Sequence, residues 1–569
     1  MTMNPNSNSV LREATHTAPP VDGERGPEPT PRHHKADAGH EIAVDASWSP
    51  ATLDILDLRL EGIANRMQRR LGQAAVSAIA RDAMDCAAAV FLPDGRVLAQ
   101  ARSLPLLLGS LIPAVAGILR RYPAAVLRAG DAILLNDPWH GGTHLPDFVL
   151  LSPVVHDGQT VALAVTILHH QDIGGATPGS LPPDAGDIFQ EGLRLPPVYW
   201  RRAGEQVADL HAILKLNSRT PDHLEGDLDA QWQALQLGVS ELGDLIAELG
   251  APAFAAQTEA LITRGAQQTR AALQALPDGD FAWQDHLDPR PGHEAIVLAA
   301  TLRKRGGTLA IDFTGSSPQQ TYPLNATPAA MLAAAFYFMR CLAPSAANNH
   351  GCLEPLTLHL PEGTVVNPRS PAPVNARTAT VKLACNTLLA AWAQADPEHA
   401  PAANASVAVV MAVGGQRADG SHYQFTEIIA GGAGAGPDGD GAPGTSTDVG
   451  NARNLPAETL EAIAPVRVEH VGLHAGSGGA GRHRGGDGVT RVYRLLEGRA
   501  VVTYRGERHL SQAAGAAGGS PGSSSRAWLE RANGQREDIA SKARFEWYPG
   551  DRLCLQTAGG GGWGQYIGK

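Results

Sequence analysis

Two apolar, β-branched runs separated by an Asp-Gly pair constrain the fold of this chain more than any other feature. The runs cover residues 148–155 and 160–168, and Asp157-Gly158 lies between them. Short runs of Val, Ile and Leu favour strands, and Asp-Gly is the pair that best fits a tight hairpin turn. The segment is therefore predicted to form an antiparallel β-hairpin.

The short turn also fixes which residues of this hairpin face one another. If His156 or its neighbour faces Thr160, the numbers of paired residues sum to about 316, and Asp147 lies opposite His169 within one residue. Because side chains alternate between the two faces, Asp147 shares a face with His169, and His170 points to the other face. The face of Asp147 is predicted to carry Val149, Leu151, Val161, Val165 and Ile167 as well.

A third polar residue, His144, lies close enough in the chain to join the pair. It precedes Asp147 by three residues, in a loop whose glycine and proline residues allow it to fold back. Two neutral imidazoles and a carboxylate form the ligand set of hydrolytic zinc sites, and they also suit manganese or iron. His144, Asp147 and His169 are therefore predicted to bind a divalent metal that keeps a position open for water. The alternative is that the two histidines cap loops and the aspartate caps a turn.

The composition favours a soluble protein and argues against nucleic-acid or membrane partners. The chain has 569 residues, 43% of them hydrophobic, and a net charge of −11. We find no apolar run long enough to span a bilayer, no signal peptide and no basic patch interleaved with aromatic residues. The 5 cysteines include no CxxC pair, which fits a reducing cytoplasm. Residues 1–46 are rich in Pro, His and charged residues and are predicted to be a disordered tail.

The spacing of apolar residues predicts an α+β fold that is mixed, β-rich and multi-lobed. An amphipathic helix is expected over 51–71, and helices are expected over 329–339 and 378–393. A helical hairpin, broken at Gly250 and Pro252, is inserted between the lobes. The predicted divisions are a metal-site lobe over 47–222, the helical hairpin over 223–278, an α+β lobe over 279–403 and a Gly-rich β lobe over 404–569.

The glycine-rich segments of the last lobe are not predicted to bind a nucleotide. GxGxxG occurs at 434–439 and 476–481, but neither segment precedes a helical pattern, as a dinucleotide site requires. No GxxxxGK[ST] loop is present, so any ATP is expected to be bound by a partner. The long glycine-rich loop over 430–450 is predicted to be either a mobile lid or a contact for a partner.

Polar blocks along the chain carry a resemblance to a known family. The blocks are NDPWHGGTHLPD at 136–147, HHQDIGG at 169–175, TPGS at 177–180, QEGLRLPP at 190–197, DFTGSSPQ at 312–319, NNHGCLEP at 348–355, NARTATVK at 375–382, NARNLPAE at 451–458, SGGAGRHRGGDGV at 477–489 and GGGGWG at 559–564. In this order they closely resemble the B subunit of the hydantoinase/5-oxoprolinase family. That family also contains caprolactamase and the acetone and acetophenone carboxylase subunits.

The resemblance implies a catalytic subunit of an ATP-dependent enzyme that opens a cyclic amide. In that family an ATP-binding A subunit phosphorylates the oxygen of a hydantoin, 5-oxoproline or lactam, and the B subunit supplies metal-activated water. The family's metal ligands correspond to His144, Asp147 and His169, and the implied assembly is a hetero-oligomer. Two alternatives remain: a subunit of an ATP-dependent ketone carboxylase, and a non-catalytic scaffold whose metal only orders its loop.

Other polar residues near the predicted metal site are candidates for catalysis. His140, His170 and Asp172 are proposed as the base or proton donor, and Asp137 is a weaker candidate. Asp172 is alternatively a hydrogen-bond acceptor that orients a ligand histidine.

Two charged residues further along the segment are candidates for substrate binding. Arg194 and Glu191 precede a rigid Pro-Pro pair, and the planar guanidinium of Arg194 suits a substrate carboxylate or a phosphate. The competing interpretation is that Arg194 forms a salt bridge with Glu191 or Asp187 that only organises the loop.

Overall fold

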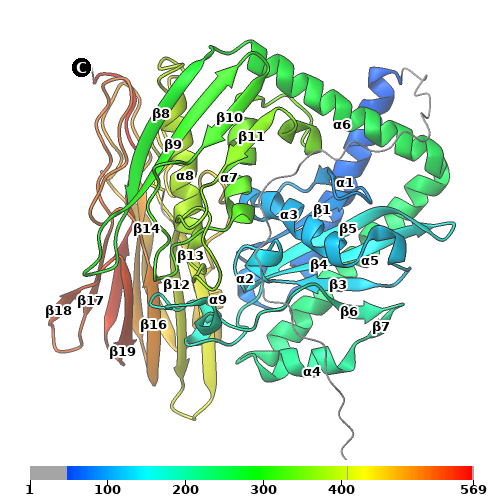
Figure 1. The fold of residues 1–569 in the computed structure, drawn as a ribbon. Helices are drawn as coiled ribbons and strands as arrows, with labels where there is room; N and C mark the ends of the chain where they lie inside the picture. The colour runs from blue at the N-terminus through cyan, green and yellow to red at the C-terminus, as the bar shows by residue number, and fades with distance from the viewer. Residues whose placement is uncertain (1–47, 407, 567–569) are drawn as a thin grey trace, which may run out of the picture. The chain divides into compact units, whose positions relative to one another are not determined.

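The fold is a mixture of helices and largely antiparallel sheets, as the sequence predicts. The structure is a computed structural model that describes residues 48–406 and 408–566, and the predicted tail over 1–46 lies outside the described residues. Within the described residues there are nine α-helices and four sheets (Figure 1). In the same residues, no helix is long and apolar enough to cross a membrane.

A seven-stranded antiparallel sheet contains the predicted hairpin at its centre. Its strand order is β2-β1-β5-β4-β3-β6-β7. The hairpin strands pair with Asp147 opposite His169, as predicted from the turn. The strands are β1 (Cys86–Phe91), β2 (Val97–Gln100), β3 (Ala132–Leu135), β4 (Asp147–His156), β5 (Gln159–His169), β6 (Val198–Arg202) and β7 (Glu205–Gln206).

Helices cover both faces of this sheet. The face that carries Val149 and Ile167 packs against α3 (Pro105–Arg121), and the face that carries Phe148 and Leu150 packs against α1 (Pro50–Ala74) and α5 (Pro221–Leu249). The amphipathic spacing over 51–71 correctly predicts α1. We did not predict α3, because its nearly continuous apolar sequence shows no clear helical period and Pro113 lies inside it.

The prediction for Val161 is wrong because the hairpin contains a bulge. Val154 pairs with Ala162, but Val155 pairs with Thr160, so Val161 is an extra residue on β5. Val161 consequently packs with the core that lies beneath α1 and α5. The bulge lies near the turn, so it leaves the pairing at the other end of the hairpin unchanged.

The remaining helices before the second sheet include the predicted helical hairpin. Gly250 has a positive φ of 80° and joins α5 to α6 (Ala251–Gln274). The two short helices of this half of the chain are α2 (Ala78–Arg81) and α4 (Ala208–Leu216).

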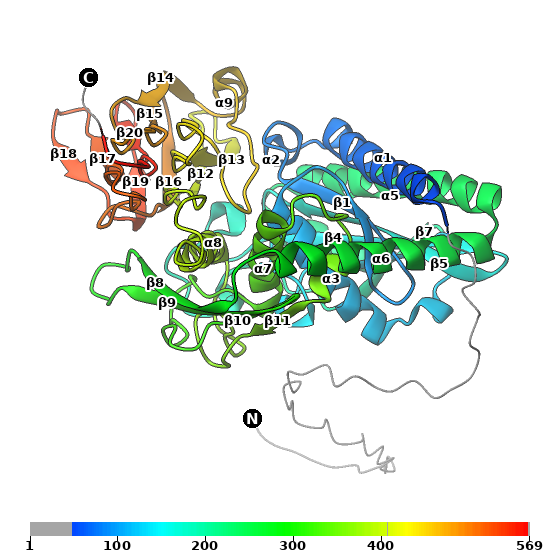
Figure 2. The same cartoon turned by 90° about the horizontal axis from the view of Figure 1, so that it is seen from above.

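A four-stranded sheet with two long helices follows. Its order is β11-β10-β9-β8, with β10 and β11 parallel and the other pairs antiparallel. Figures 1 and 2 show α7 and α8 between the seven-stranded sheet and the C-terminal strands. The elements are β8 (Gly279–Leu287), β9 (Ile296–Arg305), β10 (Thr308–Asp312), β11 (Leu356–His359), α7 (Pro328–Leu342) and α8 (Arg377–Trp392).

Two antiparallel sheets form the C-terminal part and share one apolar core. Their orders are β13-β12-β16-β19 and β14-β15-β20-β17-β18. The elements are β12 (Ala408–Gln416), β13 (His422–Ala430), α9 (Ala457–Ile463), β14 (Val466–His474), β15 (Gly488–Leu495), β16 (Arg499–Arg505), β17 (Arg526–Glu530), β18 (Arg536–Asp538), β19 (Lys542–Trp547) and β20 (Arg552–Gln556).

Glycine-rich segments beside these sheets pack directly on one another as a bundle. This glycine bundle consists of residues 431–442, 477–488, 513–522 and 558–563. Its segments are joined by backbone hydrogen bonds, for example from Gly560 N to Gly486 O at 2.9 Å and from Gly486 N to Ala433 O at 2.8 Å. A Cβ on Gly560 would lie 1.9 Å from the carbonyl oxygen of Ala433, so only glycine allows this approach. Of the two alternatives predicted for 430–450, this packing argues against a mobile lid at 431–442, and a contact for a partner stays a prediction.

Candidate metal centre

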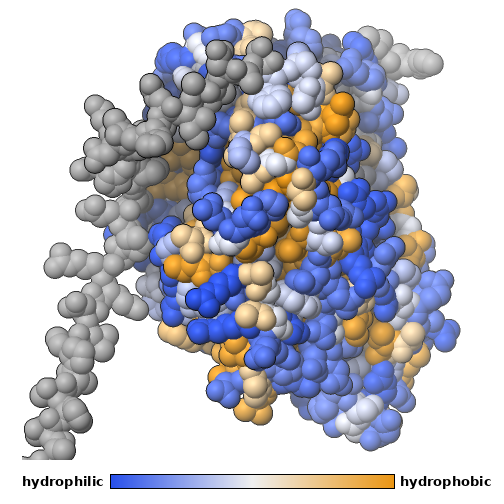
Figure 3. Space-filling view, turned by 90° about the vertical axis from the view of Figure 1, so that its right-hand side faces the viewer, coloured by the Kyte–Doolittle hydropathy of each residue, from blue (hydrophilic) through white to orange (hydrophobic). Residues whose placement is uncertain are grey.

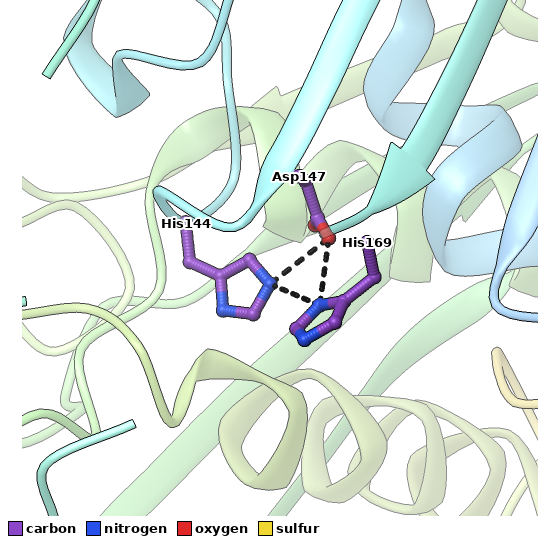
Figure 4. A group of neighbouring side chains, drawn as sticks. All are labelled: His144, Asp147 and His169. Atoms are coloured by element: carbon purple, nitrogen blue, oxygen red, sulfur yellow. Dashed lines mark hydrogen bonds and ion pairs between the residues drawn. The ribbon is translucent and has the colours of Figure 1, made fainter. Parts of the chain in front are cut away.

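Two ends of the hairpin and one loop bring the three predicted ligands together (Figure 4). Asp147 is the first residue of β4 and His169 is the last residue of β5, and the two face each other across the ladder. His144 Nε2 lies 2.9 Å from Asp147 Oδ1 and 3.1 Å from His169 Nδ1. His169 Nδ1 is 3.2 Å from Asp147 Oδ1. All three residues are buried, and together they form a cluster able to hold a metal ion.

The hydrogen bonds around His144 leave its Nε2 as an acceptor. Its Nδ1 lies 3.1 Å from the carbonyl oxygen of Asn375, which can only accept, so Nδ1 carries the proton. Nε2 then points a lone pair at the carboxylate oxygen of Asp147. Two acceptors 2.9 Å apart repel each other unless a cation lies between them. A metal at about 2 Å from each ligand atom would relieve this repulsion.

The protonation states of His144 and Asp147 also favour metal binding. Burial and the nearby Arg377 lower the pKa of His144 to about 3, so its imidazole is neutral at physiological pH. Burial opposes the charge on Asp147, but the ion pair with Arg377 holds the pKa of its carboxyl well below the usual value. A neutral imidazole and an ionised carboxylate are the protonation states that a divalent metal requires.

The second carboxylate oxygen of Asp147 is held by two donors. Thr143 Oγ1 donates to Oδ2 at 2.6 Å, and Arg377 Nη2 donates to the same atom at 2.5 Å. These contacts fix the carboxylate so that Oδ1 alone faces the histidines. Contacts of this kind orient a ligand and tune its affinity for metal.

A small cavity adjoins the cluster. It has a volume of about 50 Å³, which is enough for a few water molecules or a small polar group. Its charged and titratable lining comes from both halves of the chain: Asp85, His144, His169, Arg377, Lys382 and Arg505. The arrangement therefore places a candidate metal centre beside a buried, mainly positive space.

Sequence reasoning missed three residues of this site: Asn375, Arg377 and Arg505. Asn375 accepts from His144 through its carbonyl, and Arg377 begins α8 and pairs with Asp147. Arg505 ends β16 and donates to both oxygens of Asn375. The first two lie in the block NARTATVK over 375–382, which contributes to the family resemblance but indicates no contact, and nothing in the sequence around 505 indicated the third.

The structure does not bring His170 to the cluster. Its ring packs on Phe148, with centroids 4.4 Å apart, and its Nε2 lies 3.1 Å from Gln231 Oε1 of α5. This is the opposite face of the hairpin from Asp147, as the alternation of side chains predicts. His170 is therefore a buried residue of the helix-covered core.

Asp172 organises a loop and does not contact a ligand histidine. Its carboxylate accepts from the backbone nitrogens of Gly174, Gly179 and Arg219 and forms a salt bridge of 3.1 Å with the Arg219 guanidinium. In the described residues, Asp172 has no hydrogen bond with His144 or His169, so the alternative prediction that it orients a ligand histidine is wrong. The side chain is buried and its oxygens are occupied.

Arg194, Asp137 and His140 form a separate group, in which Arg194 of the segment before β6 contacts the loop that follows β3. Arg194 donates to Asp137 Oδ2 from Nε at 2.8 Å and from Nη2 at 2.7 Å, and it stacks over Trp139 and Phe189. His140 Nδ1 lies 3.2 Å from Asp137 Oδ1, and its side chain is half exposed. The partner of Arg194 is therefore Asp137, and not the Glu191 or Asp187 of the competing interpretation.

Glu191 is fully buried where the first half of the chain meets α8. Its Oε1 accepts from the backbone nitrogens of Val374 and Asn375 and from the Asn375 amide, and its Oε2 has no hydrogen-bond partner in the described residues. Burial raises the pKa of this carboxyl to about 8. Through Asn375, Glu191 is linked to His144 and to Arg505.

Comparisons with known proteins show which family and which solved structures this chain is similar to. The Hydantoinase B/oxoprolinase family model matches residues 49–566. The chain is 30% identical to the B component of the putative D-/L-hydantoinase of Pseudomonas sp. (strain NS671), over 81% of this chain and 80% of that protein. It superimposes on the ATP-dependent caprolactamase from Pseudomonas jessenii with a TM-score of 0.84 and 27% identity, covering 91% of this chain and 92% of that one.

A longer relative shows that this chain matches only part of some proteins. It is 29% identical to 5-oxoprolinase 1 of Arabidopsis thaliana over 90% of this chain, but it spans 42% of the length of that protein. More than half of the plant protein therefore has no counterpart in this chain.

Proposed function

The chain belongs to the hydantoinase B/oxoprolinase family, and we propose that it is the metal-dependent catalytic subunit of an ATP-dependent cyclic amide hydrolase. Its substrate class would be hydantoins, 5-oxoproline or lactams, and its metal zinc, manganese or iron. The observation that carries the proposal is the buried convergence of His144, Asp147 and His169 within 4.8 Å. Three ligands from one side leave positions for water and substrate, as in hydrolytic sites.

The residues of the chain would hold and orient the reacting groups. His144, Asp147 and His169 would bind the metal, and Arg377 and Thr143 would keep the carboxylate in place. A bound divalent metal supplies activation of water near neutral pH and polarisation of the carbon under attack. The burial of the cluster excludes bulk water, which strengthens the electrostatic interactions within it.

Proton transfer needs a titratable side chain that solvent or substrate can reach. Among the candidates of the sequence, His140 keeps a half-exposed ring, whereas His170 and Asp172 are buried among other partners. We therefore propose His140 for proton transfer in the assembled enzyme, with Asp137 holding the ring.

Activation of the amide would come from a partner that binds ATP. Two relatives are named as the B or the beta component of an enzyme, and a third is more than twice as long as this chain, which together support a second component. Ile55 and Leu58 of α1 are 60% and 67% exposed and border a groove with α5, on the side that Figure 3 shows with hydrophobic patches. Such patches mark interaction sites, so the proposed state is a hetero-oligomer. The proposed compartment is a reducing cytoplasm. All 5 cysteines are free, which fits that compartment.

The test is turnover by the complex of this chain with its nucleotide-binding partner. ATP-dependent ring opening of a hydantoin, 5-oxoproline or a lactam, independent of bicarbonate and lost after metal removal, is the expected result. Turnover of a ketone that requires bicarbonate would instead establish the carboxylase. Full activity after metal removal would reduce the cluster to a structural element and overturn the proposal.

A further inference from the structure

One buried cation of this chain lacks the partner that all comparable cations have. The described residues contain seven buried lysine and arginine side chains. Six of them have a carboxylate within 4.0 Å, and Arg505 has none in the described part of the chain. The six pairs are Lys304–Asp278, Arg377–Asp147, Lys382–Asp448, Arg491–Glu427, Arg508–Asp285 and Lys542–Glu507.

The hydrogen bonds of Arg505 leave half of its guanidinium unused. Nη1 donates to the carbonyl oxygen of Asn375 at 2.8 Å and to its Oδ1 at 2.5 Å. Nε and Nη2 have no hydrogen-bond partner among the described residues. The residue is only 7% exposed, so bulk water does not replace the missing acceptors.

A buried charge without a counter-ion is strongly unfavourable. Desolvation costs several kcal/mol for an ion unless an opposite charge and hydrogen bonds compensate, and proteins rarely retain one without a use. Burial and the neighbouring Arg377 lower the pKa of Arg505 to about 9, against an opposing effect of Glu191, so the side chain still carries its charge near neutral pH. Glu191 does not supply the counter-charge there, because burial raises the pKa of its carboxyl to about 8 and keeps it mostly protonated. The missing negative charge is therefore expected to come from outside the chain.

The cavity beside the metal cluster gives that negative charge a place. Arg505 borders the same cavity as His144 and His169, and its Nη1 shares the Asn375 carbonyl with His144 Nδ1. We propose that Arg505 binds an oxyanion of the substrate, a carboxylate or a phosphoryl group, and positions it against the metal cluster. This inference rests on the proposed function and names the group that Arg505 recognises: a carboxylate of the substrate itself or a phosphoryl group that the partner has added to it.

The chemistry of the guanidinium fits this role. A planar fork with two free donors matches the two oxygens of a carboxylate or of a phosphoryl group. Lys382, which also borders the cavity, already donates to Thr447 O at 2.5 Å and lies 3.9 Å from Asp448. Arg377 is occupied by Asp147. The Nε of Arg377 likewise has no hydrogen-bond partner in the described residues, but it is buried. Among the cavity's cations in the described residues, Arg505 is therefore the one with two unpartnered donor nitrogens and no carboxylate partner.

Binding of small anions to the purified chain tests the proposal without ATP or a partner. Inorganic phosphate and acetate are titrated separately by calorimetry, at constant ionic strength with chloride, into protein as purified and after dialysis against a chelator. We expect at least one of the two to bind, and Arg505→Gln to weaken that binding at least tenfold, as the loss of one charge-assisted pair implies. Phosphate binding would point to a phosphoryl group, and acetate binding to a carboxylate.

Two further variants complete the test. Arg499→Gln, on the exposed end of the same strand, should bind the anion as the unaltered chain does. Arg505→Lys keeps the charge but loses the planar fork, so its affinity for the anion should lie between those of the unaltered chain and Arg505→Gln. The proposal is overturned if neither anion binds to the unaltered chain, or if Arg505→Gln binds it equally well.

Stability provides a readout that a purely structural arginine would not give. Removing Arg491 strands the buried Glu427, so Arg491→Met should lower Tm by several degrees. Removing the unpaired Arg505 strands no carboxylate and removes an unfavourable buried charge, so Arg505→Met should not lower Tm without anion. A large Tm loss for Arg505→Met, with unchanged anion binding, would make Arg505 structural. Anion binding that persists in a complex inactive on cyclic amides would overturn the proposed function alone.

Discussion

The hairpin of β4 and β5 and the glycine bundle are both held by backbone hydrogen bonds, but their sequences specify them in opposite ways. In the hairpin, alternating side chains decide which residue faces which core, and this fixes the register that places Asp147 against His169. In the bundle, the absence of side chains lets Gly560 and Gly486 approach other backbones at contact distance. In the hairpin, side chains therefore select one pairing of the two strands. In the bundle, glycines allow close approach but do not select which backbone segment approaches.

This difference explains why one region was predictable and the other was not. A slip of one residue in the hairpin would expose an entire apolar face, so only one register is stable. Glycine segments carry no such pattern, and in sequence they look like loops. The contrast also predicts how each region responds to substitution.

The largest expected effect is the loss of metal from the hairpin site. Asp147→Ala, His169→Ala and His144→Ala should each abolish metal binding, because each removes a ligand from the set of three. His170→Ala should keep its metal, with affinity reduced at most about 10- to 100-fold, because its side chain lies on the opposite face. Metal content of the four purified variants is the measurement. A metal-free His170 variant beside a loaded His169 variant would show that the alternation argument is wrong.

The next effect concerns the bundle, where a Cβ added at a glycine that touches another backbone should be harmful. Gly560→Ala would place Cβ 1.9 Å from Ala433 O, and we expect a loss of at least about 3 kcal/mol in the free energy of unfolding. Gly439→Ala is the matched control, because its Cβ would meet nothing within 4 Å. Urea denaturation of both variants measures the difference. Equal stabilities would mean that the bundle tolerates side chains and that the contrast with the hairpin fails.

A smaller, pH-dependent effect is expected at Glu191, which links the first half of the chain to α8 and β16. Its folded pKa, raised by burial to about 8, exceeds the value of 4.5 for a free carboxyl. The folded state therefore keeps the proton while the unfolded state loses it, so this residue costs stability increasingly between about pH 4.5 and 8. The free energy of unfolding of Glu191→Gln, relative to that of the parent, should therefore rise by about 2 to 4 kcal/mol between these pH values. Above pH 8 this difference should stay nearly constant. Unfolding free energies measured at pH 5, 7 and 8.5 check this, and the same difference at all three would contradict it.

The smallest effect on folding is expected at Arg194, on a loop beside the hairpin sheet. Arg194→Lys keeps the charge but loses the fork that grips Asp137, and this partly exposed pair should cost no more than about 1 kcal/mol of stability. If Arg194 also handles substrate, kcat/KM of the assembled complex should fall about tenfold. Unchanged kcat/KM would restrict Arg194 to holding Asp137 and the loop.

Local sequence patterns were sufficient where contacts are close along the chain. The turn at Asp157-Gly158 and the strand alternation placed Asp147 opposite His169, and the spacing of apolar residues predicted α1. The same reasoning failed at Val161, because a β-bulge adds an unpaired residue to one strand, and the alternation of apolar residues does not show where a bulge lies. It also failed for α3, whose apolar sequence is compatible with several buried structures.

The rest of the site depends on contacts between distant parts of the chain. Arg377 contacts Asp147 across 230 positions, and Arg505 contacts Asn375 across 130. No local pattern records such pairs, because their geometry exists only when α8 and β16 pack beside the hairpin.

By itself, the sequence determined the hairpin, its register and the three candidate ligands, because a tight turn and alternating side chains leave one pairing that buries the apolar faces. Only the tertiary structure decided which residues surround those ligands. It placed Arg377 on Asp147, turned His170 and Asp172 to other partners, and left Arg505 beside the cavity without an ion-pair partner in the described residues. It also packed the glycine segments into a bundle. The physical reason is that burial and ion pairing between distant segments are decided by the packing of whole elements, and local sequence carries no record of that packing.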